Sequence, residues 1–395
     1  MDSLRLAALG LKAATRLGLD AVSPASLPYR AEDVRDPKVL SRLLNEGSLG
    51  LTDGPVEITR VTQQGIPSVS SNCENLVLSI EQGREAGLPS SIFVKIPMAS
   101  WATRWFFSVI HSWKLESEFF RHVAADLPLL TPRTYATDWR GSRFYLVQEN
   151  LNEDPGVELF TNPDMLAGPS LERVRQCLDT FARLHAIHFG LGAAEREAIL
   201  PLTWHPFLSP TLGPVSRTLN RMGLAPCLKR YPGALPPEIE AAYRLSLEHW
   251  SRLRAHWFEG PLSLLHGDSH LGNFYVRGAE MGMLDWQAVH WGKGIRDVEY
   301  FLVDSLPAEV LAAHERELVD YYCARRAVHG EPIDPEQTWQ DYRGFTFHTL
   351  MTIVVSIGFG ALNEDQDRLM REILSRTVAA AQRVDYPGWL RGLLA

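Results

Sequence analysis

The chain has 395 residues, of which 45% are hydrophobic and 22% are charged, a balance typical of soluble globular proteins. This length is enough for two or three domains with sizeable cores. The formal net charge of −8 and the lack of a dense Lys/Arg run argue against a nucleic-acid partner. The four cysteines lie far apart and form no CxxC pair, which favours reduced thiols in a cytoplasmic protein over a zinc or disulfide framework.

The first 50 residues have a helical pattern. Leucines and basic residues such as Lys12 and Arg16 occur there without the long apolar core or small-residue cleavage site of a targeting peptide. We therefore expect an amphipathic helix at the N-terminus. A second helix is expected at Asp36–Leu44, whose sequence DPKVLSRLL is typical of a capped helix start.

From Val56 to about Gln148 the pattern changes to short β-rich runs separated by Gly, Ser and Pro turns. The runs are VEITRV, NLVLSI and SIFVKI, then a mostly helical stretch at 101–123, then RTYAT and RFYLVQ. From Asp154 onward helical periodicity dominates. We predict an α+β chain with a β-rich N-terminal lobe, residues 1–150, and a mostly helical C-terminal lobe, residues 151–395.

Residues 344–362 contain no Lys, Arg, Asp or Glu and approach the length of a membrane span. They also include His348, several Thr residues and several glycines. We therefore expect a helix buried in the C-terminal lobe rather than a membrane span.

The most informative stretch is HGDSHLGN, residues 266–273, followed by LDW at 284–286. Asp268 precedes Asn273 by five residues, and Asp285 follows twelve residues later, at the end of a predicted hairpin. Phosphoryl transfer requires a carboxylate that accepts the proton of the attacking hydroxyl and oxygen ligands that hold magnesium. We predict Asp268 as the general base, or at least as the group that orients the substrate hydroxyl, and Asn273 and Asp285 as Mg²⁺ ligands; a cap or turn aspartate is the alternative.

Two other residues are expected to support this loop. His266 would brace it by hydrogen bonding, and Asp297, at the start of a later helix, would brace it through backbone N–H groups. His185 lies on the apolar face of its predicted helix and is expected to be a core histidine. A sharper alternative is that His266, Asp268 and His270 form an HxDxH zinc site, although no second His cluster lies nearby in the sequence.

Lys95 ends the apolar strand SIFVKI, where its ammonium group would pair with the α- and β-phosphates of a nucleotide. Glu116 is its expected ion-pair partner, and Glu118 is the runner-up. A GxxxxGK[ST] phosphate loop is absent. The loop QQGIPSVSSNCE has a single glycine, so hydroxyls and backbone amides of Ser68, Ser70 and Ser71 are the candidates to cover phosphates; an ordinary hairpin loop is the alternative.

Five aromatic residues lie between 101 and 113, namely Trp101, Trp105, Phe106, Phe107 and Trp113. We expect them to pack in the core of the N-terminal lobe. An apolar lid over a substrate is the alternative.

With these residues in place, the chain resembles the phosphotransferase family that includes aminoglycoside phosphotransferases and choline kinases, and most closely its ecdysteroid-kinase-like branch. The resemblance extends from about residue 60 to 305. The motifs that carry it are FVKIP, ESEFF, YLVQENL, LHAIH, HGDSHLGN, LDWQ and GIRDVEYFL.

This resemblance implies a two-lobed, protein-kinase-like fold with ATP between the lobes. It implies that Lys95 and Glu116 serve the phosphates, that Asp268 is the base and that Asn273 and Asp285 bind magnesium. It places near the adenine the four residues Gln148, Glu149, Asn150 and Leu151. Trp286-Gln287 replaces the Phe-Gly that follows the metal aspartate in protein kinases, and an APE-like segment is absent, which favours a small-molecule substrate over a protein.

The expected activity is therefore the ATP-dependent phosphorylation of a hydroxyl on a small molecule. Residues 155–260 have roughly balanced charge, whereas a site for cationic aminoglycosides would need excess acid. The aromatic content favours an apolar alcohol, such as a sterol-like or hydroxyacyl compound. The alternatives are an antibiotic phosphotransferase of the aminoglycoside type, a non-catalytic nucleotide-binding relative and a metal-dependent hydrolase.

Overall fold

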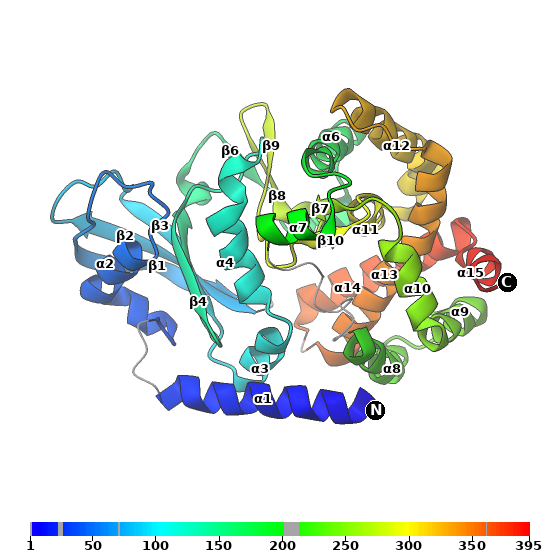
Figure 1. Ribbon diagram of the computed structural model, residues 1–395, viewed down its shortest axis with the longest axis horizontal. Coiled ribbons are helices and arrows are strands. Elements are labelled where there is room, and N and C mark those ends of the chain that lie inside the picture. Colours follow the sequence, from blue (N-terminus) through cyan, green and yellow to red (C-terminus); the bar gives the residue numbers. More distant parts are fainter. Residues whose placement is uncertain (1, 23–26, 70–71, 201–212, 361) are drawn as a thin grey trace. The chain divides into compact units, whose positions relative to one another are not determined.

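The computed structural model describes residues 2–22, 27–69, 72–200, 213–360 and 362–395 (Figure 1). The chain forms two compact units. Unit 1 consists of Met1–Asp126, Leu130–Glu158 and Leu284–Ala288, and unit 2 consists of Leu127–Leu129, Leu159–Met283 and Val289–Ala395. The predicted α+β class is confirmed, because unit 1 contains a five-stranded sheet and unit 2 is mostly helical.

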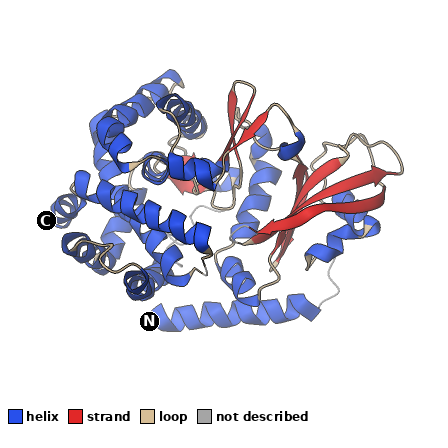
Figure 2. Cartoon of the chain, turned by 180° about the vertical axis from the view of Figure 1, so that it is seen from behind, coloured by secondary structure: helices blue, strands red, loops and turns tan. Residues whose placement is uncertain are grey.

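Unit 1 is built around an antiparallel sheet, whose strands are drawn in red in Figure 2. The strand order is β1-β2-β3-β5-β4. The strands are β1 (Ile58–Val69), β2 (Cys73–Gln82), β3 (Ser91–Pro97), β4 (Thr134–Arg140) and β5 (Arg143–Glu149). All five predicted strands are therefore present. Val, Ile and Leu are prominent among the buried residues of the three central strands, β2, β3 and β5, as expected from the side chains that strands favour.

The segment that we expected to be a loop, QQGIPSVSSNCE, is largely strand, and that expectation is wrong. β1 pairs with β2 as far as Ser68 and Val69, and its register shifts between Gln64 and Ser68. Gly65 lies at this shift with φ +63, a conformation that glycine adopts without a Cβ clash and that is typical of bulges. The strand therefore continues past the glycine. Ser68 lies in β1, whereas Ser70 and Ser71 lie outside the described residues.

Four α-helices accompany the sheet in unit 1, namely α1 (Asp2–Val22), α2 (Pro37–Glu46), α3 (Trp101–Val109) and α4 (Ser112–His122). The predicted helix start is confirmed, since the Asp36 carboxylate accepts the Lys38 N–H at 2.8 Å. Figure 1 shows α2 and α4 on opposite sides of the sheet. Short 3₁₀ helices lie at η1 (Ala31–Arg35), η2 (Ala124–Asp126) and η3 (Leu151–Glu153).

The aromatic segment at 101–113 is divided between α3 and α4 by His111, which has φ 57. Trp113 is buried, as expected for core packing. Trp101, however, is 56% exposed, so the expectation of core packing is wrong for that residue. The Trp105 indole donates to the carbonyl of Gly10 at 2.9 Å and thereby joins α3 to α1.

Unit 2 contains the remaining α-helices of the described chain. They are α5 (Asn162–Ala167), α6 (Leu171–Ile187), α7 (Ala193–Ile199), α8 (Gly213–Arg230), α9 (Pro237–Glu248), α10 (Trp250–Phe258), α11 (Ile295–Ser305), α12 (Ala308–Val328), α13 (Pro335–Phe359), α14 (Glu364–Arg383) and α15 (Tyr386–Leu394). Two small antiparallel pairs join β7 (Ser263–Leu265) to β10 (His290–Gly292) and β8 (Phe274–Arg277) to β9 (Glu280–Met283). The short strand β6 (Val157–Leu159) is divided between the units, because Glu158 belongs to unit 1 and Leu159 to unit 2.

Two expectations about the helical part are confirmed. On α6, Val174, Leu178, Phe181 and His185 are buried, as their spacing predicted. The uncharged stretch at 344–362 falls mainly in α13, most of whose residues from Gly344 to Ile357 are buried in unit 2. Within the described residues, each helix is too short or too polar to traverse a bilayer.

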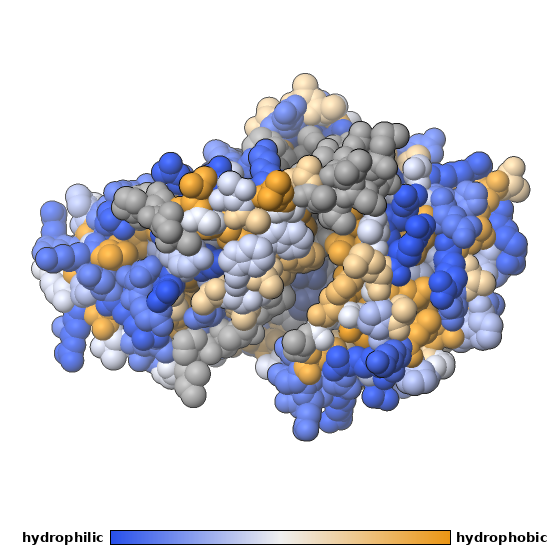
Figure 3. All heavy atoms as spheres, turned by 90° about the horizontal axis from the view of Figure 1, so that it is seen from below, coloured by the Kyte–Doolittle hydropathy of each residue, from blue (hydrophilic) through white to orange (hydrophobic). Residues whose placement is uncertain are grey.

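The surface carries both hydrophilic and hydrophobic side chains. The face drawn in Figure 3 mixes hydrophilic and hydrophobic residues. Among the described residues, the large hydrophobic side chains that are exposed are Leu11, Leu19, Leu51, Trp101, Met222, Val328 and Phe359.

Candidate active site

Lys95 lies on β3 at the centre of a buried ion-pair cluster in unit 1. Its Nζ is 2.9 Å from Glu116 Oε1, 3.0 Å from Glu116 Oε2 and 2.8 Å from Asp285 Oδ1. Lys95 is 4% exposed and Glu116 is 1% exposed. The prediction that Glu116 is the partner of Lys95 is confirmed, whereas the runner-up Glu118 accepts the indole N–H of Trp139 at 2.8 Å.

The charges in this cluster are strongly coupled. Burial alone would lower the pKa of Lys95, but the carboxylates of Asp285 and Glu116 more than offset this effect and raise it above its ordinary value. Burial, together with the negative charge of Asp285, raises the pKa of Glu116 to about 7 against the opposing effect of Lys95. Two carboxyl groups thus share one ammonium group, and a further cation would relieve the excess negative charge.

The segment that carries Asp285 belongs to unit 1, although the strands on either side of it, β9 and β10, belong to unit 2. Asp285 has φ 54, a left-handed conformation that is uncommon for a residue with a Cβ and that is often found at functional sites. The next residue, Trp286, is fully buried and stacks on Phe119 of α4, with the ring centroids 3.9 Å apart and the planes 10° apart. This stacking and the contact with Lys95 hold Asp285 against the sheet.

The chain at the end of β5 is also well fixed within unit 1. The Asn150 amide donates to Ser91 Oγ at 2.9 Å, and its oxygen accepts the N–H of Asn152 at the start of η3. Gln148 donates to Thr134 Oγ1 at 2.9 Å, and the Glu149 carboxylate accepts the N–H of Arg133 at 2.8 Å. Leu151, the last of the four residues expected near adenine, is 8% exposed.

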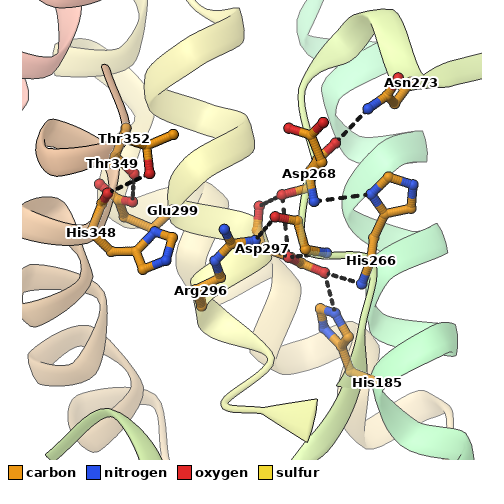
Figure 4. Close-up of polar contacts among 12 residues, drawn as sticks. His185, His266, Asp268, Asn273, Arg296, Asp297, Glu299, His348, Thr349 and Thr352 are labelled. Carbon is orange, nitrogen blue, oxygen red and sulfur yellow. Dashed lines mark hydrogen bonds and ion pairs between the residues drawn. The ribbon is translucent and has the colours of Figure 1, made fainter. Parts of the chain in front are cut away.

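The HGD loop lies in unit 2 between β7 and β8 and is held by Asp297 of α11 (Figure 4). One oxygen of the Asp297 carboxylate accepts the His266 N–H at 2.7 Å, and the other accepts the Gly267 N–H at 3.1 Å. Ser269 Oγ donates to the carbonyl of Asp297 at 3.0 Å. The prediction that Asp297 braces this loop through backbone N–H groups is therefore confirmed.

Within the loop, the side chains expected to act lie close together. His266 Nδ1 accepts the Asp268 N–H at 3.3 Å, so the predicted bracing by His266 is confirmed. The amide nitrogen of Asn273 donates to the carbonyl of Asp268 at 2.7 Å, which leaves the side-chain oxygen of Asn273 as the atom suited to a cation. Gly267 has φ +87, so the turn that presents Asp268 requires a residue without a Cβ.

The environment of Asp297 keeps it ionised. Burial by itself would raise its pKa, but the hydrogen bond from His185 and the positive charge of Arg296 lower it well below its usual range. Arg296 donates to Asp297 at 2.9 Å and also to the carbonyl of Gly267. An ionised carboxylate is an acceptor only, which suits a residue that receives several N–H groups.

His185 is a core histidine, as expected, and it is also part of this network. Its Nε2 is 3.4 Å from Asp297, and its Nδ1 is 2.9 Å from the Tyr322 hydroxyl. A Cβ at Gly294 would lie 2.5 Å from that hydroxyl and 2.7 Å from His185 Nδ1, so the close approach requires glycine. The roles of Arg296 and Tyr322 were not predicted from the sequence, where the position of Arg296 directly before Asp297 was the available signal.

The predicted ligands of zinc and of magnesium differ in the donor atoms that they leave available. His270 Nε2 is 4.0 Å from Asp268 Oδ2, and His266 Nδ1 is engaged with the loop backbone. Among the described residues, no group of three or more His, Cys, Asp or Glu side chains is arranged to hold a metal ion. Asp285 uses Oδ1 for Lys95 and retains its second oxygen, and Asn273 retains its amide oxygen, which are the hard donors that Mg²⁺ prefers.

The structure thus brings the predicted residues together in two sets. Unit 1 contains Lys95, Glu116 and Asp285 in direct contact, with the segment Gln148–Leu151 at the end of β5. Unit 2 contains His266, Asp268 and Asn273 in one braced loop. The roles assigned to these residues remain predictions.

Comparisons with known proteins show which solved structures the chain is similar to. The fold is similar to a choline/ethanolamine kinase family protein from Mesorhizobium loti, with 15% identity, coverage of 92% of this chain and 97% of that chain, and a TM-score of 0.46. It is similar to a choline kinase from Streptococcus pneumoniae, with 13% identity, coverage of 85% and 94%, and a TM-score of 0.46. It is similar to a macrolide 2′-phosphotransferase from Brachybacterium faecium, with 16% identity, coverage of 87% and 97%, and a TM-score of 0.45.

No curated protein matches the chain. The sequence profile of the ecdysteroid kinase-like family matches residues 76–329, well over half of the chain, which confirms the resemblance inferred from the motifs. The chain belongs to the ecdysteroid kinase-like family.

Proposed function

We propose that the protein is an ATP-dependent phosphotransferase that phosphorylates a hydroxyl group of a small molecule, with Mg²⁺ as the metal. The observation that carries this proposal is the buried contact of Lys95 with both Glu116 and Asp285. A lysine at the end of a central strand, fixed by one acid and adjacent to a second, is arranged to bind nucleotide phosphates beside a metal ligand. Membership in the family supports the same class of reaction.

The proposed reaction forms a bond between the substrate oxygen and the γ-phosphorus and breaks the bond from that phosphorus to the bridging oxygen of ADP. Asp268 accepts the proton of the attacking hydroxyl. Lys95 contributes positive charge at the phosphates, and Glu116 holds its ammonium group in place. Mg²⁺ held by Asn273 and Asp285 would neutralise the remaining phosphate charge.

The remaining residues have supporting roles in this proposal. Backbone and side-chain bonds fix Gln148–Leu151, which we assign to the adenine. Ser68, Ser70 and Ser71 stay candidates to cover the phosphates. We also propose a cytoplasmic location, because the four cysteines are buried and form no disulfide among the described residues.

We further propose that the acceptor is an apolar alcohol, such as a sterol-like or hydroxyacyl compound. Residues 155–260 contain ten Asp and Glu against eleven Lys and Arg, without the acidic excess that a polycationic aminoglycoside would require. Aminoglycosides are the second class of acceptor to include in the test.

The test begins with binding. ATP with Mg²⁺ should raise the melting temperature, and either component alone should have a smaller effect. ATP consumption is then measured over sterols, hydroxyacyl compounds, sugars and aminoglycosides, with Asp268→Asn as the matched inactive control. Binding without turnover by any acceptor would favour the non-catalytic relative. Stoichiometric zinc in the purified protein, without a response to MgATP, would favour the metal-dependent hydrolase.

A further inference from the structure

Asn72 is a fully buried residue immediately before β2 whose hydrogen bonds reach three separate segments of unit 1. Its side-chain nitrogen donates to Gln287 Oε1 at 2.6 Å and to Ser112 Oγ at 3.2 Å. Its backbone carbonyl accepts the N–H of Met98 at 3.0 Å. Ser112 Oγ also donates to the same oxygen of Gln287 at 3.3 Å, so the three side chains are hydrogen-bonded to one another.

The three segments are the ones that carry the charged cluster. Met98 follows the end of β3, three residues after Lys95. Ser112 is the first residue of α4 and lies one helical turn before Glu116. Gln287 lies two residues after Asp285. One amide side chain and one carbonyl therefore connect the backbones from which all three members of the cluster extend.

The chemistry of asparagine suits this position. Its amide nitrogen has two hydrogens, so one atom can serve two acceptors that lie in different directions. Alanine would remove both donated bonds, so Ser112 Oγ would lose its bond from Asn72 in a buried place and Gln287 Oε1 would lose the shorter of its bonds from Asn72 and Ser112. Losing a bond in a buried place is more costly than losing it at a surface. Shorter hydroxyl side chains have a single hydrogen to donate.

We propose that Asn72 is a positioning residue for the phosphate and metal cluster: it joins β3, α4 and the segment Leu284–Ala288 so that Lys95 meets Glu116 and Asp285. Its effect on metal and nucleotide rests on the proposed function. Its effect on the geometry of the cluster does not, and the two are measured separately.

The matched control is Asn45 in α2, which is also an asparagine of unit 1 with several hydrogen bonds. Its side-chain nitrogen donates to the carbonyl of Val56 at 2.8 Å, and its oxygen accepts the Val56 N–H at 2.8 Å. These bonds join α2 to the chain before β1 and involve none of the three segments that carry the cluster. Asn45 is more exposed than Asn72, but its two bonds to Val56 are part-buried. Asn45→Ala therefore removes these two side-chain bonds from the same unit without touching the proposed joint.

The geometric test uses the full-length protein without nucleotide. The rate at which an amine-reactive reagent labels Lys95 is measured by mass spectrometry, relative to the exposed Lys38. We expect Asn72→Ala to increase Lys95 labelling about 10-fold, because the ion pairs of Lys95 open more often when one buried and one part-buried hydrogen bond are lost. Asn45→Ala, compared at an equal unfolded fraction, should stay within about 2-fold of the natural protein, since its bonds lie outside the opening segments. Equal labelling in Asn72→Ala and the natural protein, or an equal increase in both variants, would overturn the proposal.

The functional test is a Mg²⁺ titration at fixed ATP, read as the binding of nucleotide and, where an acceptor is known, as turnover. Asn72→Ala should raise the Mg²⁺ concentration for half-maximal effect about 10-fold or more, as is common when a residue that orients a metal ligand is lost. Asn45→Ala should leave it unchanged. A natural protein that does not bind MgATP would defeat the proposed function, while the labelling result would still decide the role of Asn72.

A second variant covers the case in which Asn72→Ala does not fold. Gln287→Met keeps the length of the side chain and the bond between Asn72 and Ser112, but it removes the acceptor on the segment that carries Asp285. The expected shift in Mg²⁺ demand has the same direction. An unchanged Mg²⁺ demand in a folded Gln287→Met protein would contradict the proposed joint.

Discussion

Units 1 and 2 hold their charged residues in different ways. In unit 1, Lys95 is held by ion pairs to the side chains of Glu116 and Asp285, which come from distant parts of the chain. In unit 2, Asp297 holds the HGD loop through the backbone N–H groups of His266 and Gly267. The first arrangement joins side chain to side chain, and the second joins a carboxylate to the backbone.

This difference predicts which contacts a bound ligand can rearrange and which contacts it leaves in place. A side-chain ion pair can exchange partners when a phosphate or a cation arrives, since each charged group keeps its own rotatable bonds. A loop held through its backbone keeps its conformation with or without a ligand. We therefore expect MgATP to change the contacts of Lys95 and Asp285 and to leave the hydrogen bonds of Asp297 unchanged.

The largest expected effect is that of Asp268→Asn on phosphotransfer. The hydrogen bonds of Asp268 to His266 and Asn273 use its own N–H and carbonyl, so these two bonds survive the substitution. Removing the base should lower turnover about 10²–10⁴-fold, with melting temperature and nucleotide affinity nearly unchanged. Turnover and nucleotide binding are measured on the same preparation. Retained turnover would remove Asp268 from the role of base.

Asp297→Asn tests the arrangement in unit 2, in which a carboxylate holds the backbone of the HGD loop. An amide has one acceptor oxygen, whereas both oxygens of Asp297 now accept hydrogen bonds. We expect a loss of about 2–4 kcal/mol of unfolding free energy at pH 7. Because the pKa of Asp297 is lowered, its contribution is present above the ordinary carboxyl pKa and is lost as the pH falls, so the variant should respond less to acid.

The control for Asp297→Asn is Asp320→Asn on α12. The Asp320 side chain is 48% exposed and pairs with Arg316 at 3.0 Å. An exposed pair of this kind contributes about 0–1 kcal/mol, so denaturant unfolding should barely change. Equal losses in the two variants would contradict the bracing role of Asp297.

Lys95→Met tests the arrangement in unit 1, in which side chains hold one another by ion pairs. It leaves the carboxyl groups of Glu116 and Asp285 without their shared cation, and the cost should be about 3 kcal/mol at pH 8. The pKa of Glu116 is already raised to about 7, so protonation near pH 5 should relieve much of this loss. Unfolding is measured at both pH values, with the exposed Lys38→Met as the control. A loss independent of pH would argue against the coupled cluster.

The smallest expected effect concerns Glu299, two residues after Asp297 in α11. Burial raises the pKa of Glu299 to about 8, and its carboxyl accepts the hydroxyl of Thr349 (Figure 4). A raised acid pKa means that the folded state binds more protons between about pH 4.5 and 8, so stability falls as the pH rises through that window. Glu299→Gln removes this fall and should be about 1–2 kcal/mol more stable than the natural protein at pH 9, with little difference at pH 5. Parallel pH profiles of unfolding would contradict this assignment.

The features that could be predicted from the sequence are those that depend on neighbouring residues in the chain. The strands, the capped start of α2 and the buried face of α6 follow from side-chain periodicity and from residues a few positions apart. The bracing role of Asp297 was predictable because its motif directly follows the HGD and LDW motifs. The strand through Gly65 was not, because a bulge depends on pairing with β2 and not on β1 alone.

In the candidate site too, contacts between distant segments were not predictable from the sequence pattern. Glu116 was predicted to be the partner of Lys95, but the second partner, Asp285, is 190 residues away in the chain. The positive φ of Asp285 and the contacts of Asn72 have no signature in their neighbouring residues. Hydrogen bonds and ion pairs between distant segments depend on where the chain returns, and the sequence pattern does not specify that place.

The order and chemical nature of the motifs, from FVKIP through HGDSHLGN to LDWQ, were enough to determine the family. The tertiary structure decided which charged groups touch, which are buried and which share a partner. The physical reason is that residue type and spacing set local conformation and donor chemistry, whereas burial and long-range contact set the pKa values and the strength of each interaction.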